Sequence, residues 1–353
     1  MTNYFSDALK QVDSLRSRDG YYILAFESSC DETAVSVTKG RQIVSNIISS
    51  QIEIHRRFGG VVPEIASRNH ALMISGLAEE ALRAAGLGIG DISAVAVTRG
   101  AGLLGALLVG VSYAKALAYA RSLPLIAVNH IKGHVAANYI SAPDLRPPFI
   151  ALLASGGHTY ILSVKSMSDM EILGQTLDDA VGEAFDKAAR VLGLPYPGGP
   201  EIERAAALGS PLYPLPRAFK GDKRLDFSFS GLKTALINTV HGMNMRGETY
   251  SINDVARSFQ NEAVGVLIDH TAEAVKRTGI RTVALAGGVG ANTALRESLT
   301  ARGARDGFEV LLPPKKLCTD NAAMIGVAAY EMIREGALPS PLSLDADPGL
   351  EIN

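Results

Sequence analysis

A strand–turn–strand unit occurs twice in this sequence. The first copy is Ala25-Phe-Glu-Ser-Ser-Cys-Asp-Glu-Thr33, and the second is Leu152-Leu-Ala-Ser-Gly-Gly-His-Thr159. In each copy an apolar run typical of a buried strand ends in a short polar turn, and a second strand follows. Internal similarity of this kind indicates a duplicated structural unit. The sequence therefore predicts an α/β protein with two similar lobes.

Length and composition agree with two lobes. A chain of 353 residues is longer than one compact core needs, and its hydrophobic share of 47% is typical of a folded protein. We expect an N-terminal extension over residues 1–20, a first lobe over 21–130, a second lobe over 131–340 and a tail over 341–353. The net charge of −2 excludes a general cationic field, so any contact with nucleic acid must use local clusters.

Three features favour a cytoplasmic location. The two cysteines, Cys30 and Cys318, are too few for a disulfide framework. The first twenty residues lack the apolar core of a signal peptide, and their apolar residues instead have the spacing of a short amphipathic helix. The apolar segment 102–120 carries Lys115 and three glycines, which favours a buried helix over a membrane span.

The remaining pattern alternates strands with helices. Strands are predicted over 21–28, 33–38, 42–50, 92–97, 149–154, 159–164, 282–286 and 308–312. Helices are predicted over 70–85, 103–121, 176–193, 252–277 and 321–335. Thr176 and Asp179 have the spacing of a capping box, a Pro- and Gly-rich break covers 195–200, and a polar loop extends from Pro211 to Lys233.

Two of the turns are rich in glycine. Ser155-Gly156-Gly157 follows a predicted strand, and Gly287-Gly288-Val289-Gly290 follows another and precedes a helix. Such turns offer backbone N–H groups that can bind phosphate, although ordinary tight turns are the simpler interpretation of each one alone. A dinucleotide fingerprint fails because Thr293 stands where a third glycine belongs, and no P-loop occurs. Together the turns predict a nucleotide cleft between two lobes of the actin, sugar-kinase and heat-shock ATPase type.

His130 and His134 are candidate metal ligands. They lie four positions apart, which places both imidazoles on one face of a helix, and Asp320 could add a carboxylate oxygen. The alternatives are a plain pair of helix histidines and, for Asp320, the N-cap of the last helix. Asp186 could accept hydrogen bonds from a ribose or form an ion pair with Arg190 on a solvated helix face.

Several motifs together resemble one family along residues 21–335. They are Phe26-Glu-Ser-Ser-Cys-Asp-Glu-Thr33, His55-Arg-Arg-Phe-Gly-Gly-Val-Val-Pro-Glu-Ile-Ala-Ser-Arg-Asn-His70, Val128-Asn-His-Ile-Lys-Gly-His134, Ser155-Gly-Gly-His-Thr159, Gly182-Glu-Ala-Phe-Asp-Lys187, Tyr196-Pro-Gly-Gly-Pro200, Ala286-Gly-Gly-Val-Gly-Ala-Asn292 and Cys318-Thr-Asp-Asn321. The sequence resembles the bacterial TsaD family of tRNA adenosine threonylcarbamoyltransferases, which were once called glycoproteases.

The resemblance implies a reaction and a site. A threonylcarbamoyl group would pass from threonylcarbamoyl-AMP to the N6 amine of the adenosine next to the anticodon, in tRNAs that read codons starting with A. The product would be t6A, with release of AMP. The implied metal ligands are His130, His134 and Asp320, around one divalent ion, Fe2+ before Zn2+. The implied adenylate-binding residues are Leu153, Ala154, Ser155, Gly156, Gly157, Asp186, Gly199, Glu203 and Asn292.

The resemblance also implies partners. These are tRNA, threonylcarbamoyl-AMP and the proteins TsaB and TsaE, with no membrane. The apolar helix over 103–121 suggests that the first lobe docks a partner protein. Two basic clusters are candidates for tRNA binding: His55, Arg56, Arg57, Phe58 and Arg68, and then Arg217, Lys220, Lys223 and Arg224 with Phe227 and Phe229. Asp31 and Glu32 are candidates for handling the proton of the attacking amine.

Three other functions compete with this one. A zinc metalloprotease needs a glutamate directly after the first histidine, where this chain has Ile131. A small-molecule kinase of the same fold has no need for a two-histidine metal site. A nucleotide-gated scaffold without activity would share the fold, and a turnover assay with tRNA would distinguish it from an enzyme.

Overall fold

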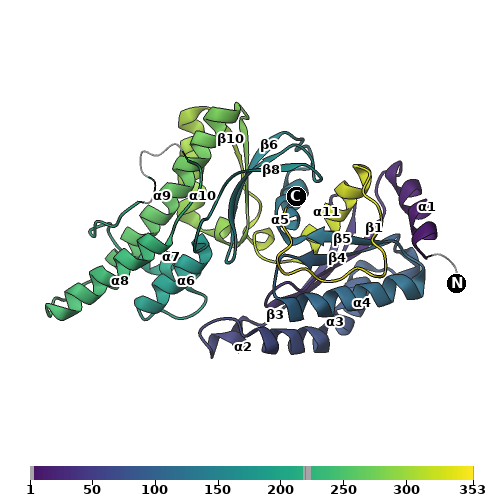
Figure 1. Ribbon diagram of the computed structural model, residues 1–353, viewed down its shortest axis with the longest axis horizontal. Coiled ribbons are helices and arrows are strands. Elements are labelled where there is room, and N and C mark those ends of the chain that lie inside the picture. The colour runs from purple at the N-terminus through teal and green to yellow at the C-terminus, as the bar shows by residue number, and fades with distance from the viewer. Residues whose placement is uncertain (1–3, 218, 220–223, 353) are drawn as a thin grey trace. The chain divides into compact units, whose positions relative to one another are not determined.

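The computed structural model describes residues 4–217, 219 and 224–352. These residues form two compact units (Figure 1). The first unit comprises Met1–Leu145, Lys165–Met170 and Thr319–Asn353, and the second comprises Arg146–Val164 and Glu171–Cys318. Each unit is built around a mixed five-stranded sheet.

The first unit contains strands β1 to β5. They are β1 (Tyr22–Glu27), β2 (Glu32–Lys39), β3 (Gln42–Ser50), β4 (Ala94–Gly100) and β5 (Leu125–Asn129). Their order in the sheet is β3-β2-β1-β4-β5. β1 pairs antiparallel with β2 and parallel with β4, and β4 pairs parallel with β5.

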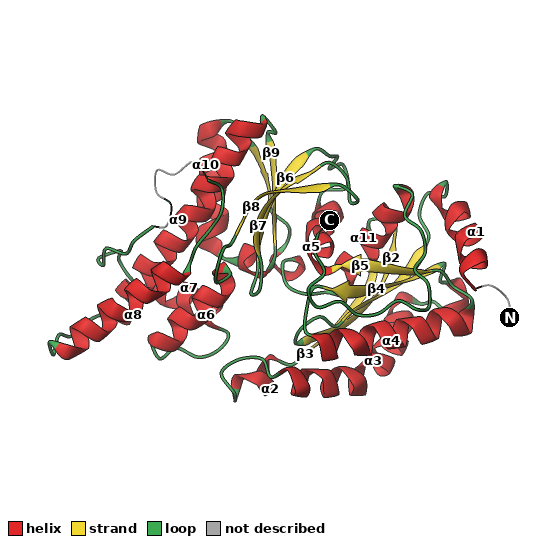
Figure 2. Ribbon diagram, viewed as in Figure 1, coloured by secondary structure: helices red, strands yellow, loops and turns green. Residues whose placement is uncertain are grey.

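Helices cover both faces of this sheet (Figure 2). They are α1 (Tyr4–Arg16), α2 (Ile52–Arg56), α3 (Pro63–Ala85), α4 (Leu104–Arg121), α5 (His130–Ser141) and α11 (Ala322–Arg334), with a 3-10 turn over Ile89–Asp91. Leu24, Phe26 and Val35 alternate along the strands and pack with α3 and α4 into one core. The helix α11 covers the other face and contacts β1 and β2. Because both faces are covered, β1 and β4 are buried along almost their whole length.

The second unit repeats this topology. Its strands are β6 (Phe149–Ala154), β7 (Thr159–Val164), β8 (Met170–Gln175), β9 (Thr282–Ala286) and β10 (Glu309–Leu311). Their order, β10-β9-β6-β7-β8, reverses to β8-β7-β6-β9-β10, which matches the first sheet strand for strand. β6 pairs antiparallel with β7 and parallel with β9, as β1 does with β2 and β4. The predicted duplication is confirmed.

Five helices accompany the second sheet within the described residues. They are α6 (Val181–Val191), α7 (Gly198–Ala207), α8 (Ser230–Met245), α9 (Ile252–Thr278) and α10 (Thr293–Asp306), with 3-10 turns over Gly288–Ala291 and Lys315–Leu317. Phe185 packs against Phe259 with ring centroids 5.4 Å apart, and both belong to one large apolar cluster that joins these helices to β6 and β9.

The compact units have other boundaries than the expected lobes at 21–130 and 131–340. Helix α5 and helix α11 pack on each other, and both belong to the first unit. Gly133 explains the close approach, because a Cβ atom there would lie 2.7 Å from Ile325 Cδ1. Within the expected extension, Tyr4–Arg16 form helix α1, which contacts α11 and has Val12 and Leu15 buried, as its amphipathic spacing predicted.

The C-terminal tail is held on the first unit. Asn129 Nδ2 donates to the carbonyl oxygens of Leu350 and Glu351 at 3.2 and 2.9 Å, and Lys115 Nζ donates to that of Leu344 at 2.7 Å. Ile352 is buried. Gly100 allows this contact, since a Cβ atom there would overlap the carbonyl oxygen of Asp347.

Candidate functional site

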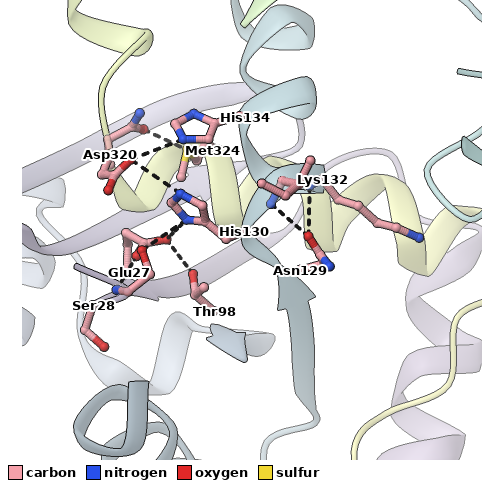
Figure 3. A network of polar contacts seen from close by, with 12 residues as sticks. Glu27, Ser28, Thr98, Asn129, His130, Lys132, His134, Asp320 and Met324 are labelled. Atoms are coloured by element: carbon pink, nitrogen blue, oxygen red, sulfur yellow. Dashed lines mark hydrogen bonds and ion pairs between the residues drawn. The ribbon is translucent and has the colours of Figure 1, made fainter. Parts of the chain in front are cut away.

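His130, His134 and Asp320 come together in the first unit (Figure 3). Helix α5 begins at His130, where the Asn129 side chain caps it by accepting from Ile131 N at 2.8 Å. One helical turn later, His134 presents its ring on the same face. The Nε2 atoms of the two histidines lie 3.6 and 3.2 Å from Asp320 Oδ1. One ligand atom from each residue lies within 4.8 Å of the others.

Asp320 is not the cap of the last helix. Asn321 is the N-cap of α11, and its Oδ1 accepts a hydrogen bond from Met324 N at 3.1 Å. The capping interpretation of Asp320 is therefore wrong. Its carboxylate lies beside the two histidines instead.

The donor set suits a divalent metal ion. Two imidazole nitrogens and one carboxylate oxygen leave coordination positions open for a substrate or for water. His134 is 1% exposed, and among the described residues neither of its ring nitrogens has a partner with hydrogen-bond geometry. Because buried polar atoms in proteins are nearly always satisfied, this ring is better explained as a ligand than as core packing.

The electrostatics of the site also favour a cation. Burial opposes the charged form of His130, yet the carboxylates of Asp320 and Glu27 raise its pKa to about 9. Two acidic side chains thus face one imidazole ring in a site with little solvent. A positive charge at this position is strongly favoured, whether a proton or a metal ion provides it.

Asp31 lies in the turn after β1, and Glu32 is the first residue of β2. Asp31 is buried, and burial together with the charges of Asp31 and Asp320 raises the pKa of Glu32 to about 9. Glu32 also accepts a hydrogen bond from Ser50 Oγ at 3.1 Å. The turn therefore places a protonated carboxyl group next to a second acidic side chain at neutral pH.

In the second unit, residues Leu153–Gly157 form the end of β6 and the turn to β7. Ser155 N donates to the carbonyl oxygen of His158 at 2.8 Å, and His158 N donates to Ser155 Oγ at 3.1 Å. Gly156 and Gly157 are exposed, and no heavy atom lies within 4 Å of a Cβ built on either. Their backbone is thus open to a ligand.

Helix α6 starts against this turn. A Cβ atom on Gly182 would lie 2.6 Å from the carbonyl oxygen of Ser155, and Gly182 N donates to that oxygen at 3.1 Å. The turn after β9 also approaches β6, because Gly287 has φ +84° and its Cβ would lie 2.4 Å from Ala154 O. Two glycines therefore bring three segments of the second unit together around the end of β6.

The other expected adenylate residues have defined local contacts. Asn292 caps α10 by accepting from Leu295 N at 3.0 Å and donates to Gln260 Oε1 at 2.9 Å. Glu203 Oε1 accepts from Thr293 N at 2.9 Å, which places α7 beside this helix start. Asp186 Oδ1 accepts from Gly198 N at 2.6 Å, and Gly199 next to it is open to a ligand. The structure thus joins Glu203 to the start of α10, and Asp186 to the start of α7.

The first basic cluster is partly neutralised. Arg56 pairs with Glu53 at 2.9 Å, and Arg68 pairs with Glu64 at 2.7 Å. Phe58 is 57% exposed, as expected for a ring that could stack on a base, whereas His55 is buried.

The second basic cluster differs from expectation. Arg217 pairs with Glu262 and Asp269 at 2.8 and 2.7 Å. Phe227 and Phe229 are fully buried in the core, so the idea that they lie ready for RNA is wrong. Lys220 and Lys223 lie outside the described residues, and Arg224 stacks over Phe219.

Sequence reasoning missed Glu27, a residue in contact with His130. Glu27 is buried at the end of β1, with its Oε2 at 3.1 Å from His130 Nδ1. A signal existed, because an acidic residue in an otherwise apolar strand must have a buried partner.

No helix in the described part of the chain is long and apolar enough to cross a membrane. This agrees with the interpretation of segment 102–120 as a buried helix.

Known proteins resemble this chain in sequence. The family TsaD, tRNA N6-adenosine threonylcarbamoyltransferase, matches residues 42–327. The tRNA N6-adenosine threonylcarbamoyltransferase of Clostridium perfringens strain SM101 is 53% identical over 332 residues, which cover 94% of this chain and 98% of the relative. The Clostridium kluyveri protein of the same name, from strain ATCC 8527, is 52% identical over 333 residues, covering 94% of this chain and 97% of the relative.

Solved structures share the fold. Full-length HypF, in a phosphate- and nucleotide-bound form, aligns with a TM-score of 0.62 at 19% identity, covering 92% of this chain and 48% of HypF. The activator of 2-hydroxyisocaproyl-CoA dehydratase from Clostridium difficile, with bound ADPNP, aligns with a TM-score of 0.51 at 14% identity. The alignment covers 89% of this chain and 96% of the activator. At these identities the likeness concerns the fold alone.

Proposed function

The chain belongs to the TsaD family, and we propose that it transfers a threonylcarbamoyl group from threonylcarbamoyl-AMP to tRNA. The acceptor is the N6 amine of the adenosine next to the anticodon, in tRNAs that read codons starting with A. The products are t6A and AMP. The observation that carries this proposal is the 53% identity over 94% of the chain to a protein of that name. The grouping of His130, His134 and Asp320 supports it.

The reaction is an acyl transfer from a mixed anhydride. The amine nitrogen attacks the carbamoyl carbon, the bond from that carbon to the phosphate oxygen breaks, and the amine loses one proton. AMP is a good leaving group, so holding the two reactants in the right geometry accounts for much of the required rate. We assign the proton to the carboxyl pair Asp31 and Glu32, which lies close enough to Asp320 to feel its charge.

We assign His130, His134 and Asp320 as the ligands of one divalent ion, with Fe2+ as the first candidate and Zn2+ as the second. Such an ion, when bound by these residues, would offset negative charge that develops on the carbonyl and phosphate oxygens. Two imidazoles and one carboxylate suit either metal.

The second unit would bind the adenylate part. The exposed amides of Gly156 and Gly157, at the end of Leu153–Gly157, are suited to phosphate. Asp186, beside the open Gly199, is the candidate acceptor for ribose hydroxyls. Glu203 and Asn292 would shape the pocket wall through the start of α10.

Partner proteins complete the proposal. Helices α3 and α4 carry exposed apolar side chains, among them Leu72, Leu104 and Leu108. This surface supports docking of TsaB, with TsaE as a second partner. A cytoplasmic location fits the free cysteines Cys30 and Cys318.

A reconstitution assay tests the function. The purified protein, with and without TsaB and TsaE, is incubated with preformed threonylcarbamoyl-AMP and unmodified tRNA, and the digested nucleosides are analysed by mass spectrometry. We expect t6A to accumulate. If the complete mixture forms no t6A while binding its partners and nucleotide normally, the scaffold interpretation replaces the enzyme.

A further inference from the structure

Glu27 is a fully enclosed carboxylate, 1% exposed, at the end of β1. Its Oε1 accepts a hydrogen bond from Ser29 N at 2.6 Å. Its Oε2 accepts one from Thr98 Oγ1 at 2.6 Å and lies 3.1 Å from His130 Nδ1 (Figure 3). Both oxygens therefore have fixed partners on three segments of the first unit. A carboxylate buried at such cost needs a reason to be there.

The contact with His130 decides which ring nitrogen faces the metal centre. Because Nδ1 faces Glu27, the opposite nitrogen, Nε2, faces Asp320. A carboxylate accepts hydrogen bonds and cannot donate one, so the proton of a neutral His130 ring belongs on Nδ1 and the lone pair on Nε2. Ser29 Oγ lies 3.2 Å from the same Nδ1. Its hydroxyl hydrogen can rotate away, so that the oxygen faces a proton on Nδ1.

His134 lacks a comparable support. Its Nδ1 is buried, and within the described residues no hydrogen-bond partner reaches it. The two histidines are thus unequal: a carboxylate faces Nδ1 of His130, whereas among the described residues none faces Nδ1 of His134, whose Nε2 lies 3.2 Å from Asp320 Oδ1.

We propose that Glu27 is a positioning residue of the metal centre, which holds His130 so that its Nε2 lone pair points at the ion. The proposal rests on the metal site assigned above and adds a residue to it. Carboxylates that orient a ligating imidazole raise metal affinity by about 10- to 100-fold in other metalloproteins. Thr98 supports the arrangement by fixing Glu27 Oε2.

The decisive variant is Glu27→Gln. Glutamine has nearly the same size, and its amide oxygen can still accept from Ser29 N. Its NH2 group then faces His130 Nδ1, which favours the ring form with the proton on Nε2, where it blocks the metal. The variant and the wild type are stripped of metal and titrated with Co2+ by visible absorption, and then with Zn2+ in competition with a chelating dye.

Glu331→Gln is the matched control. Glu331 is also a buried carboxylate of the first unit, and it pairs with Arg41 at 2.8 Å, on helix α11. The same chemical change there removes an ion pair without touching His130. We expect Glu27→Gln to bind Co2+ and Zn2+ about 10- to 100-fold more weakly, with altered Co2+ absorption bands, and Glu331→Gln to match the wild type.

The outcomes separate this proposal from the metal site itself. Wild-type affinity and spectrum in folded Glu27→Gln, together with lost binding in His130→Ala, would overturn the positioning role alone. Wild-type binding in both His130→Ala and His134→Ala would overturn the metal site. If Glu27→Gln does not fold, Thr98→Val decides. It should weaken Co2+ binding several-fold while Thr98→Ser does not, and unchanged binding in Thr98→Val would reject the proposal.

Discussion

At the scale of single residues, Asp320 and Asn321 divide two tasks. Asn321 caps helix α11, which leaves the Asp320 carboxylate beside His130 and His134. Adjacent residues with separate contacts allow the proposed metal site and the start of α11 to be changed independently.

We expect His130→Ala and His134→Ala each to abolish bound metal and threonylcarbamoyl transfer while the fold persists. The reason is that each removes one of the three proposed donors and shortens no side chain of the apolar core. Asn321→Ala, which removes the cap, should instead cost about 1 kcal/mol of stability and keep the metal. Metal analysis of anaerobically purified protein, circular dichroism and the t6A assay measure these effects. A double histidine variant that modifies tRNA at the normal rate would disprove the ligand assignment.

Arg57 is the strongest candidate for tRNA contact in the first basic cluster. Arg56 already pairs with Glu53, whereas the structure shows no acidic partner for Arg57 among the residues it describes. Arg57→Ala should weaken tRNA binding and reduce its salt slope by about 1, with a smaller effect for Arg56→Ala and none on AMP binding. Filter binding over a range of KCl concentrations measures this. Arg305→Ala, on α10, controls for the loss of one exposed charge. If tRNA affinity depends equally on salt concentration in Arg57→Ala and in the wild type, the first basic cluster does not bind tRNA.

At the scale of elements, the start of helix α6 depends on a glycine. A side chain at Gly182 would collide with the backbone of Ser155, while one at Gly156 would meet no atom. Gly182→Ala should therefore lower the free energy of unfolding by about 1–3 kcal/mol and weaken AMP binding, because the turn must move. Gly156→Ala should leave stability unchanged. Thermal denaturation and AMP titration measure both variants. Wild-type stability in Gly182→Ala would show that the start of α6 can shift to accommodate a side chain without loss of stability.

His270 on helix α9 is expected to make the stability of the second unit depend on pH. Burial lowers the pKa of His270 below its ordinary value of 6.5. Hydrogen bonds to the backbone of Leu225 and Asp226 raise the pKa, but burial has the larger effect. Just below pH 6.5 the unfolded chain then binds more protons than the folded one, so stability falls as the pH falls through this window. His270→Gln, which keeps an amide donor but cannot titrate, should lose less stability between pH 7.5 and 5.5 than the wild type. His241→Gln, on the exposed side of α8, should behave like the wild type in urea denaturation at both pH values. Identical losses in all three proteins would exclude His270 as the source.

The sequence predicted elements well where local pattern decides them. The strand over 42–50 has the predicted bounds, and the helix over 103–121 begins only one residue later. The sequence-based predictions were wrong where contacts between distant segments determine the bounds of an element. Thr176 pairs with Phe227 in an isolated bridge and its Oγ1 donates to Asp179 O, so α6 starts only at Val181. The predicted break at 195–200 contains the start of α7, because the Asp186 carboxylate accepts from Gly198 N.

The same distinction applies to the site. His130, His134 and Asp320 were identified from motifs, and the structure groups them. The core positions of Phe227 and Phe229 could not be predicted, since they depend on helices α8 and α9, which pack around them.

At the scale of the whole molecule, the exposed apolar surface of α3 and α4 predicts dependence on partners. The protein alone should not support multiple turnovers, and adding TsaB and TsaE should restore them. Leu104→Asp with Leu108→Asp should weaken TsaB binding at least tenfold, because charged groups would enter an apolar interface. Leu208→Asp, at a more exposed leucine of the second unit, should not weaken TsaB binding. Calorimetric titration with TsaB measures the effect, and full turnover by the protein alone would contradict it.

The first unit closes only when helix α11 joins strands made much earlier. About 190 residues separate His134 from Asp320. Since ribosomes add ~5–20 residues per second, Asp320 is synthesised about 10–40 s after the two histidines. The second unit, by contrast, is complete once Cys318 has been made. During translation the second unit can therefore be completed before the first, and His130, His134 and Asp320 can come together only as synthesis ends. A chain truncated before Thr319 could keep the glycine turns yet would lack the metal triad.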